Sequence, residues 1–202
     1  MKLYGMLDSP YVRRLAISLD VLGVGFEHEP LSVFSAFEAF SHINPVVKAP
    51  TLSLDNGTVL MDSTLILDYV ETLSAPAARL LPPQPQARSA ALRTVGLGLA
   101  ACEKAIQVVY EHNLRPPEKL HQPWVERITQ QLLAACQELE RETAKAQPQT
   151  QRLDQAAITT AVTWSFIQLM VPDVVRSDDF PAIHAFAQDL EGTAVFQRYP
   201  VA

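Results

Sequence analysis

The chain has 202 residues, of which 48% are hydrophobic and 19% are charged, and its formal net charge at pH 7 is −6. A chain of this length can bury about 70% of the surface that it exposes when unfolded, so we expect a stable core without disulfide bonds. The negative charge, with no basic run in the sequence, argues against nucleic acids and anionic membranes as partners, and no apolar run approaches the length of a membrane span.

Short strands and helices alternate over the first part of the chain. Apolar runs at residues 2–5 and 26–31 predict two strands. The apolar spacing across residues 12–22 predicts a helix between them, which ends at Gly23. A strand, a helix and a strand at this spacing indicate a βαβ unit.

A hairpin and two further helices are predicted next. Residues 34–43 have a weaker helical pattern. Residues 51–54 and 58–61 predict strands on either side of an Asn-Gly turn, which favours a hairpin. Residues 65–73 have helical spacing again. The predicted order of elements is therefore βαβαββα.

A proline-rich stretch marks a change of pattern near residue 80. Residues 74–88 hold four of the 15 prolines and lack the periodicity of a helix or a strand. We therefore expect an interdomain linker at residues 77–86, between an α/β domain at residues 1–76 and a second domain at residues 87–202.

The second domain is predicted to be all-helical. Apolar stripes of helical spacing run through residues 92–109 and 124–139, and a last helix is predicted at residues 181–191. Residues 154–171 are apolar nearly all round, so this helix should lie at the centre of a helical bundle. Asp154 stands where it can cap the start of this helix.

The glycine content argues against a phosphate-binding loop. The chain has only 7 glycines, where average usage gives about fourteen. Residues 96–101 have the G-x-G-x-x-A spelling of a dinucleotide fingerprint, but they follow a linker rather than a strand and lie within a helical stripe. We interpret these glycines as positions of close helix packing.

The cysteines and histidines do not indicate a redox or metal site. Cys102 and Cys136 are too far apart for a C-x-x-C pair, and both fall on apolar stripes, so we expect them in the core. The five histidines lack metal-ligand spacing, and we expect no metal. Two isolated cysteines fit a reducing compartment, so we expect a cytoplasmic protein.

Ser9 and Pro10 stand where the first strand gives way to the first helix. A serine at the N-cap followed by proline at the first helical position is a common helix start. A helix N-terminus also presents free backbone donors and partial positive charge, so a hydroxyl there can help to stabilise a thiolate. The residues alone leave two possibilities open: Ser9 only caps the helix, or it caps the helix and also stabilises a thiolate.

Two later junctions have similar properties. Pro50 enters a predicted strand and is a candidate for a cis peptide bond, which would leave the backbone of Ala49 free to pair with an extended ligand. Asp62 and Ser63 stand at the next junction between a strand and a helix, where capping explains both residues. Three turns of the first domain thus combine a hydroxyl, a free backbone segment and a carboxylate beside a helix N-terminus.

These segments resemble the cytosolic glutathione S-transferase superfamily, bacterial branch. The resemblance extends over nearly the whole chain, and it rests on KLYGMLDSPYVRRL, NPVVKAPTL, DSTLILDYVE and RLLPPQPQAR in this order. It implies a thioredoxin-like N-terminal domain that binds glutathione, a helical C-terminal domain that lines the pocket for an electrophile, and a homodimer.

The resemblance also implies roles for particular residues. Ser9 matches the hydroxyl that lies near the glutathione sulfur and would be the catalytic residue. Ala49 and Pro50 match the cis-proline segment, whose backbone pairs with the cysteinyl residue of glutathione.

The remaining matched residues would bind the charged ends of glutathione. Asp62 and Ser63 match the acid and serine that hold the γ-glutamyl end, and Lys48 matches a basic position near the glycyl carboxylate. Charge supports this arrangement, because an acid can bind the ammonium group while Ser63 and the helix N-terminus bind the neighbouring carboxylate.

The sequence departs from the family pattern at several positions. Val47 replaces the usual glycine of its turn, and Asp62 is shorter by one methylene than the more common glutamate. Ala157 replaces the acid that completes the usual capping box of the central helix, which removes about 1 kcal/mol of capping. Serine rather than cysteine at position 9 argues against reactions that use a protein thiol.

The resemblance implies a glutathione transferase of a detoxifying type, which directs the glutathione thiolate onto a small hydrophobic electrophile. A non-catalytic interaction module with the same fold is an alternative. Glutathione-dependent peroxide reduction, dehalogenation and isomerisation are others. Tyr110 and Trp164 are candidates for the electrophile pocket, although residues of these types are more often part of a core.

Overall fold

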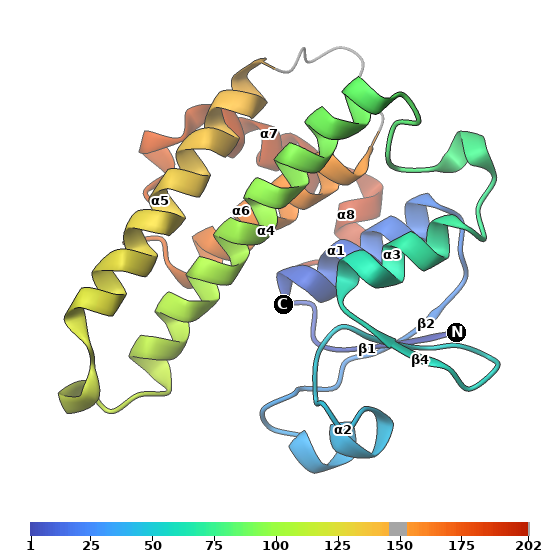
Figure 1. Ribbon diagram of the computed structural model, residues 1–202, viewed down its shortest axis with the longest axis horizontal. Helices are drawn as coiled ribbons and strands as arrows, with labels where there is room; N and C mark the ends of the chain where they lie inside the picture. The colour runs from blue at the N-terminus through green and yellow to red at the C-terminus, as the bar shows by residue number, and fades with distance from the viewer. Residues whose placement is uncertain (146–152, 202) are drawn as a thin grey trace. The chain divides into compact units, whose positions relative to one another are not determined.

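The computed structural model describes residues 1–145 and 153–201 and divides the chain into two compact units (Figure 1). One unit comprises Met1–Leu80 and the segment from Thr193 onward, and the other comprises Leu81–Gly192. The sequence places residues 193–202 with the helical domain, so this assignment differs from the observed units.

A mixed four-stranded sheet forms the centre of the first unit. Its strand order is β2-β1-β3-β4, with β1 and β2 parallel and the other pairs antiparallel. Leu3 lies opposite Leu52, and both side chains are fully buried. The strands are β1 (Lys2–Tyr4), β2 (Glu27–Glu29), β3 (Thr51–Ser53) and β4 (Val59–Met61).

Helices cover both faces of this sheet. Helices α1 and α3 lie on one face and α2 on the other (Figure 1). The order of elements confirms the predicted βαβαββα arrangement of a thioredoxin-like domain, and the hairpin of β3 and β4 confirms the prediction from the Asn-Gly turn. The helices of this unit are α1 (Pro10–Val21), α2 (Phe37–Ile43), α3 (Ser63–Glu71), the short 3₁₀ helix η1 (Pro76–Ala78) and α8 (Ala194–Arg198).

The segment from Thr193 onward is anchored on α1. The Nε of Arg13 donates to the carbonyl oxygen of Tyr199 at 2.7 Å, and its guanidinium lies 5.4 Å from the centre of the Phe196 ring. Arg198 forms an ion pair with Asp20 at 2.8 Å. The sequence does not indicate α8, because five residues are too few to establish a helical period.

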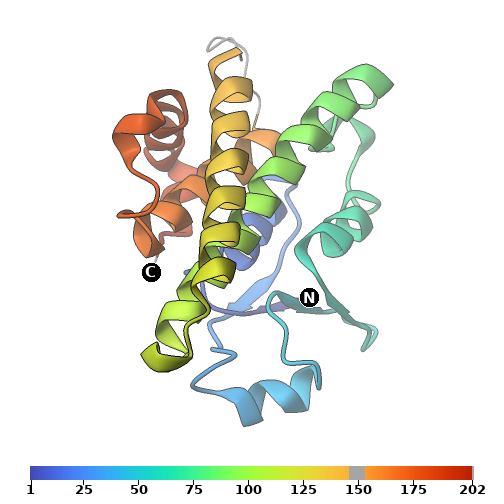
Figure 2. The ribbon, with the colours of Figure 1, turned by 60° about the vertical axis from the view of Figure 1, so that its left-hand side comes forward.

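The second unit is all-helical. Helices α4 and α5 lie side by side, α6 packs against α4, and α7 packs against α5 and α6 (Figure 2). Helix α4 begins at Pro85, inside the predicted linker, because proline is well suited to the first helical position. The elements are α4 (Pro85–Asn113), η2 (Pro117–Lys119), α5 (Gln122–Lys145), α6 (Gln155–Met170), η3 (Ser177–Asp179) and α7 (Pro181–Glu191).

Two predictions for α6 are confirmed. Most of its residues are buried, as expected for a central helix, and Asp154 caps it by accepting from the backbone N–H of Ala157 at 2.8 Å. In the described part of the chain, no helix is both long and apolar enough to cross a membrane.

Candidate functional site

Ser9 caps α1, as the sequence predicts. Its Oγ accepts a hydrogen bond from the backbone N–H of Val12 at 3.4 Å. An oxygen that accepts this bond can still donate its own hydrogen. No described residue accepts that hydrogen. The half-buried hydroxyl of Ser9 therefore has a donor to offer to a nearby anion.

Gly5 packs between the first turn of α1 and Ala49. A Cβ built on Gly5 would lie 2.5 Å from Cγ2 of Val12 and 3.1 Å from Cβ of Ala49. Gly5 also has a φ of 137°, which L side chains rarely adopt. Only glycine fits here, and its close packing places the first turn of α1 beside Ala49.

The peptide bond between Ala49 and Pro50 is cis, as expected. Pro50 is buried and Ala49 is half-buried. No described residue hydrogen-bonds to the backbone N–H or the carbonyl of Ala49. This residue therefore has a free donor and a free acceptor, which is what an extended ligand needs for pairing.

A buried asparagine that the sequence analysis missed holds this segment in place. The Nδ2 of Asn44 donates to Oγ1 of Thr51 at 2.9 Å, and its Oδ1 accepts from the backbone N–H of Val46 at 3.0 Å. Oγ1 of Thr51 in turn donates to the carbonyl of Lys48 at 2.7 Å. An asparagine before proline indicates a turn, but the sequence does not indicate that its side chain is buried.

Val47, which departs from the family pattern, has an unusual backbone. Its φ is 51°, in the left-handed region that glycine adopts without cost and that is costly for a β-branched residue. The family's preference for glycine here therefore has a local physical reason. The chain holds this turn despite the less suitable residue.

Asp62 caps α3 and contacts Lys48. Oδ1 of Asp62 accepts from the backbone N–H groups of Thr64 at 2.9 Å and Leu65 at 3.4 Å. Its Oδ2 lies 3.6 Å from Nζ of Lys48, and both side chains are about half-exposed. Two residues expected to bind opposite ends of one ligand thus form an ion pair with each other. An exposed pair of this kind contributes about 1 kcal/mol or less, so other ions can replace it.

Ser63 is buried and accepts a hydrogen bond from an arginine. Nη1 of Arg14, on α1, donates to Oγ of Ser63 at 3.0 Å and to Oγ1 of Thr64 at 3.2 Å. Arg14 is only 3% exposed. The sequence does not indicate a role for Arg14, because an arginine in the helix predicted at residues 12–22 suggests an exposed position.

The structure thus brings five of the six predicted site residues together around one loop and one helix start. The turn held by the Asn44 side chain is followed by Lys48, Ala49 and Pro50. The side chain of Lys48 forms an ion pair with Asp62, and Ser63 is the next residue in the chain. Ser9 shares no hydrogen bond with these five in the described chain, and it joins them through the packing of Gly5 against Val12 and Ala49.

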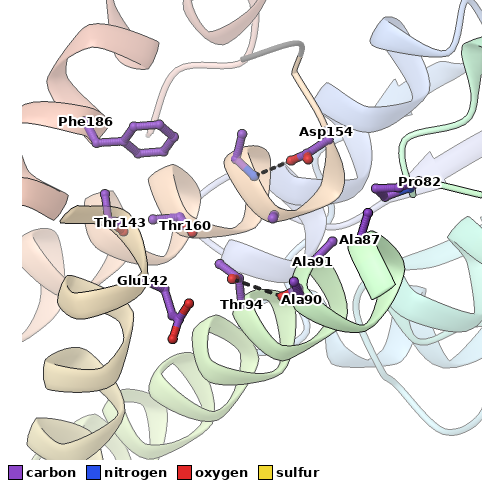
Figure 3. Close-up of a pocket in the computed structure, with 12 residues that line it drawn as sticks. Pro82, Ala87, Ala90, Ala91, Thr94, Glu142, Thr143, Asp154, Thr160 and Phe186 are labelled. Atoms are coloured by element: carbon purple, nitrogen blue, oxygen red, sulfur yellow. Dashed lines mark hydrogen bonds between the residues drawn. The ribbon is translucent and has the colours of Figure 1, made fainter. Parts of the chain in front are cut away.

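The helical unit contains a cavity of about 380 Å³ with a largely apolar lining from α4, α5, α6 and α7 (Figure 3). Most of its polar residues are already engaged in hydrogen bonds or ion pairs. Glu142 is paired with Arg93 at 3.4 Å and with Lys145 at 3.3 Å, and Asp154 caps α6. Thr94 donates to the carbonyl of Ala90 at 3.3 Å. The residues that line this cavity include none of the predicted site residues.

Both cysteines are core residues, as predicted. Cys102 and Cys136 are free and buried, and Cys102 donates to Oγ1 of Thr163 at 3.3 Å. Burial, with a smaller contribution from the nearby Cys102, raises the pKa of Cys136 to about 12. Such a thiol carries almost no thiolate at neutral pH and is a poor nucleophile.

The two pocket candidates of the helical unit have different surroundings. Trp164 is buried, and its indole N–H donates to Nδ1 of His184 at 3.2 Å, so it belongs to the core. Tyr110 is about two-fifths exposed.

Among the described residues, no group of three or more histidine, cysteine or acidic side chains is arranged to hold a metal ion.

Comparisons with known sequences agree on one family. Residues 3–78 match the model of the family described as the glutathione S-transferase N-terminal domain. The uncharacterised GST-like protein YibF of Escherichia coli is 35% identical over 85 residues, which are 42% of each chain. The maleylacetoacetate isomerase of Mus musculus is 32% identical over 92 residues, which are 43% of this chain and 42% of the relative. The matches thus span about two-fifths of these relatives.

A comparison with solved structures extends the likeness to the whole chain. A glutathione transferase family member from Pseudomonas fluorescens, solved with bound glutathione, has a TM-score of 0.84 and 28% sequence identity. That likeness covers 100% of this chain and 98% of the other. With its thioredoxin-like and helical units, the chain belongs to the glutathione S-transferase superfamily.

Proposed function

We propose that the protein is a glutathione transferase, which binds glutathione and directs its thiolate onto a small hydrophobic electrophile. Glutathione presents four recognisable groups: an ammonium and a carboxylate at its γ-glutamyl end, a cysteinyl residue with a thiol, and a glycyl carboxylate. The first unit offers a partner for each of them.

The observation that carries the proposal is the grouping of free donors and acceptors around the Ala49 segment. The backbone of Ala49 suits the cysteinyl residue, and Gly5 holds it beside the first turn of α1. Ser9 then offers its hydroxyl hydrogen to the sulfur. Ser63 lies at the N-terminus of α3, where a carboxylate is favoured.

The ion pair of Lys48 with Asp62 can be replaced by ion pairs with the charged groups of glutathione. Nζ of Lys48 and Oδ2 of Asp62 are 3.6 Å apart, so the two side chains neutralise each other. Glutathione would offer its ammonium to Asp62 and its glycyl carboxylate to Lys48. Because an exposed ion pair contributes little, the two ion pairs with glutathione can replace it.

The reaction begins from the thiolate of glutathione. In conjugation, its sulfur gives an electron pair to the electrophilic carbon, and the leaving group departs with the pair of the broken bond. If the free thiol resembles cysteine, about 3% of it is ionised at pH 7. Lowering its pKa by about two units raises the rate only about threefold, because a weaker base is a weaker nucleophile. Most of the acceleration must therefore come from holding the electrophile against the sulfur.

The helical unit would supply the residues that select the electrophile, and we expect the active form to be a cytoplasmic homodimer. Both expectations rest on the family, and the two buried free cysteines are compatible with a reducing compartment. Sedimentation velocity would give a single species of twice the chain mass, and a monomer at micromolar concentration would contradict the dimer.

Calorimetry at millimolar glutathione, followed by turnover measurements on a panel of aryl and alkyl electrophiles, tests the proposal. We expect saturable binding and conjugation of at least one apolar electrophile. Absence of binding would reject the proposal at its first step. Binding without turnover, together with a stable protein partner, would favour a non-catalytic module instead.

The role of Ser9 can be separated from its cap. Ser9→Ala should raise the pKa of the bound thiol by about one unit, because it removes a hydrogen bond to the thiolate, and ultraviolet titration of the thiolate measures this. Ser9→Thr keeps the hydroxyl and should restore the value. Asp154→Ala is the matched control, since it removes a cap of similar strength from α6. If the pKa of the bound thiol is unchanged in Ser9→Ala, Ser9 caps α1 and does not stabilise the thiolate.

Isomerisation is a second candidate, because the mouse relative is an isomerase. A bound thiolate can add to a double bond, which leaves a single bond that can rotate. Its departure with the electron pair of the carbon–sulfur bond restores both the thiolate and the double bond. No glutathione is consumed. The two reactions are distinguished by the glutathione balance, since conjugation consumes one thiol for each product and isomerisation consumes none.

A further inference from the structure

Helix α1 carries two adjacent arginines that are both buried, Arg13 and Arg14. Arginine is charged at all ordinary pH values, and its guanidinium donates hydrogen bonds without accepting any. A buried guanidinium is costly unless its surroundings use its charge and its donors. Arg13 anchors the segment from Thr193 onward, through Tyr199 and Phe196. Arg14 points instead to the start of α3.

The direction of the hydrogen bond from Arg14 has a consequence for Ser63. Because Nη1 of Arg14 can only donate, Oγ of Ser63 accepts at 3.0 Å and keeps its own hydrogen to give away. In the described ranges no residue accepts that hydrogen or the backbone N–H of Ser63. The backbone N–H groups that donate to Asp62 are those of Thr64 and Leu65, not that of Ser63. Ser63, itself 3% exposed, therefore has two unused donors.

These two donors lie where positive potential is concentrated. The N-terminus of α3 carries partial positive charge, and the guanidinium of Arg14 adds a full charge one hydrogen bond away from Ser63. Donors in such surroundings select an anion, and two of them on one residue suit the two oxygens of a carboxylate. The Asp62 carboxylate alongside suits the ammonium of the same α-amino acid group.

We propose that Arg14 is a positioning residue, which aligns and polarises the hydroxyl of Ser63 so that it binds the α-carboxylate at the γ-glutamyl end of glutathione. This inference rests on the proposed function and adds the residue that sets its selectivity for a free α-amino acid group. Arg14 acts through Ser63 and need not touch the ligand.

The test compares glutathione with 4-aminobutyryl-cysteinylglycine, which lacks only that carboxylate. Affinities of both ligands are measured by calorimetry for the wild type, Arg14→Gln and Arg14→Lys. We expect the wild type to prefer glutathione, and Arg14→Gln to reduce the ratio of the two affinities by about tenfold, as expected for loss of a charge-assisted hydrogen bond. Arg14→Lys keeps the charge and should restore part of the preference.

Arg13→Gln is the matched control, because it removes a neighbouring buried arginine of the same helix that does not contact Ser63. It should lower the melting temperature and leave the ratio of affinities unchanged. If Arg14→Gln fails to fold, the comparison uses Ser63→Ala with and without Arg14→Lys. Once Ser63 lacks its hydroxyl, Arg14→Lys should have no further effect on the ratio.

The outcomes separate the two hypotheses. If the wild type does not bind glutathione, the proposed function itself fails. If it binds glutathione, an unchanged ratio in Arg14→Gln, or an equal change in Arg13→Gln, would overturn the role of Arg14 alone. An effect of Arg14→Lys that persists in Ser63→Ala would also overturn it, because Arg14 would then act without Ser63.

Discussion

At the scale of single residues, Val47 shows how the turn before Ala49 is constrained. Its φ of 51° is costly for a β-branched side chain, by about 1–3 kcal/mol. The turn persists because Asn44 fixes it from within, through Thr51 and the backbone of Val46. The backbone of Ala49 is thus held in place by a buried amide rather than by a favourable residue at position 47.

Val47→Gly should therefore stabilise the protein. Glycine adopts this φ without strain, and its greater freedom in the unfolded chain offsets part of the gain, so we expect about 1 kcal/mol more free energy of unfolding. Urea unfolding measures the change. Val46→Gly is the control, because the exposed Val46 has no positive φ and should lose about 0.5–1 kcal/mol. Similar losses in both variants would contradict the strain at Val47.

Cys136 should make stability depend on alkaline pH. Its pKa is raised from an ordinary value of 9.0 to about 12 in the folded protein, so between these values the unfolded chain loses a proton that the folded chain keeps. Its contribution to stability is complete below pH 9 and declines as the pH rises towards 12. From pH 7 to pH 10 the free energy of unfolding should fall by about 1 kcal/mol more in the wild type than in Cys136→Ala. Equal slopes in chemical unfolding would contradict the raised pKa.

The residues of the candidate site differ in how far the sequence reveals them. Ser9, Pro50 and Asp62 stand at junctions of elements, where local chemistry restricts the residue type, and their positions could be predicted. Asn44 and Arg14 could not be predicted as site residues. They act through burial and through partners distant in the chain, and neither property leaves a local pattern.

At the scale of elements, the buried face of α4 differs from the one that its apolar spacing predicts. The apolar stripe of residues 92–109 begins at Leu92, but the side chain of Leu92 is 45% exposed. The buried stripe is shifted by one residue and consists largely of small side chains. Close packing of α4 with α5 and α6 selects such residues, and a search for large apolar side chains passes over them. Besides Glu111 near the end of α4, the buried residues are Ala91, Val95, Gly98, Ala101, Cys102, Ala105 and Val108.

Gly98 and Gly96 test this packing as a pair. A Cβ on Gly98 would lie 2.9 Å from Cγ2 of Thr159 and 3.0 Å from Oγ1 of Thr163, so Gly98→Ala should destabilise the protein by about 1–2 kcal/mol despite its better helix propensity. Gly96 has no heavy atom within 4 Å of such a Cβ, so Gly96→Ala should stabilise by about 0.5–1 kcal/mol. Thermal unfolding of both variants measures the difference. Changes of the same sign would contradict the close approach of α6 at Gly98.

At the scale of the whole molecule, the two units have different relations to the sequence. The first unit alternates strands and helices with distinct start and stop signals from β1 to α3, so the order of these seven elements could be predicted. The last segment, from Thr193 onward, joins this unit through Arg13, which no local pattern indicates. All six predicted site residues lie between Ser9 and Ser63 in this unit, whereas the helical unit shows no motif for the residues that we propose to select a substrate.

A crystal structure of the protein with glutathione bound tests the central claim most directly. The γ-glutamyl carboxylate is expected on Ser63 with its ammonium on Asp62, the cysteinyl backbone on Ala49, and the sulfur within hydrogen-bond distance of Oγ of Ser9. The glycyl carboxylate should lie near Lys48, with the pair of Lys48 and Asp62 separated. Glutathione bound elsewhere, or bound here with its sulfur away from Ser9, would contradict the account.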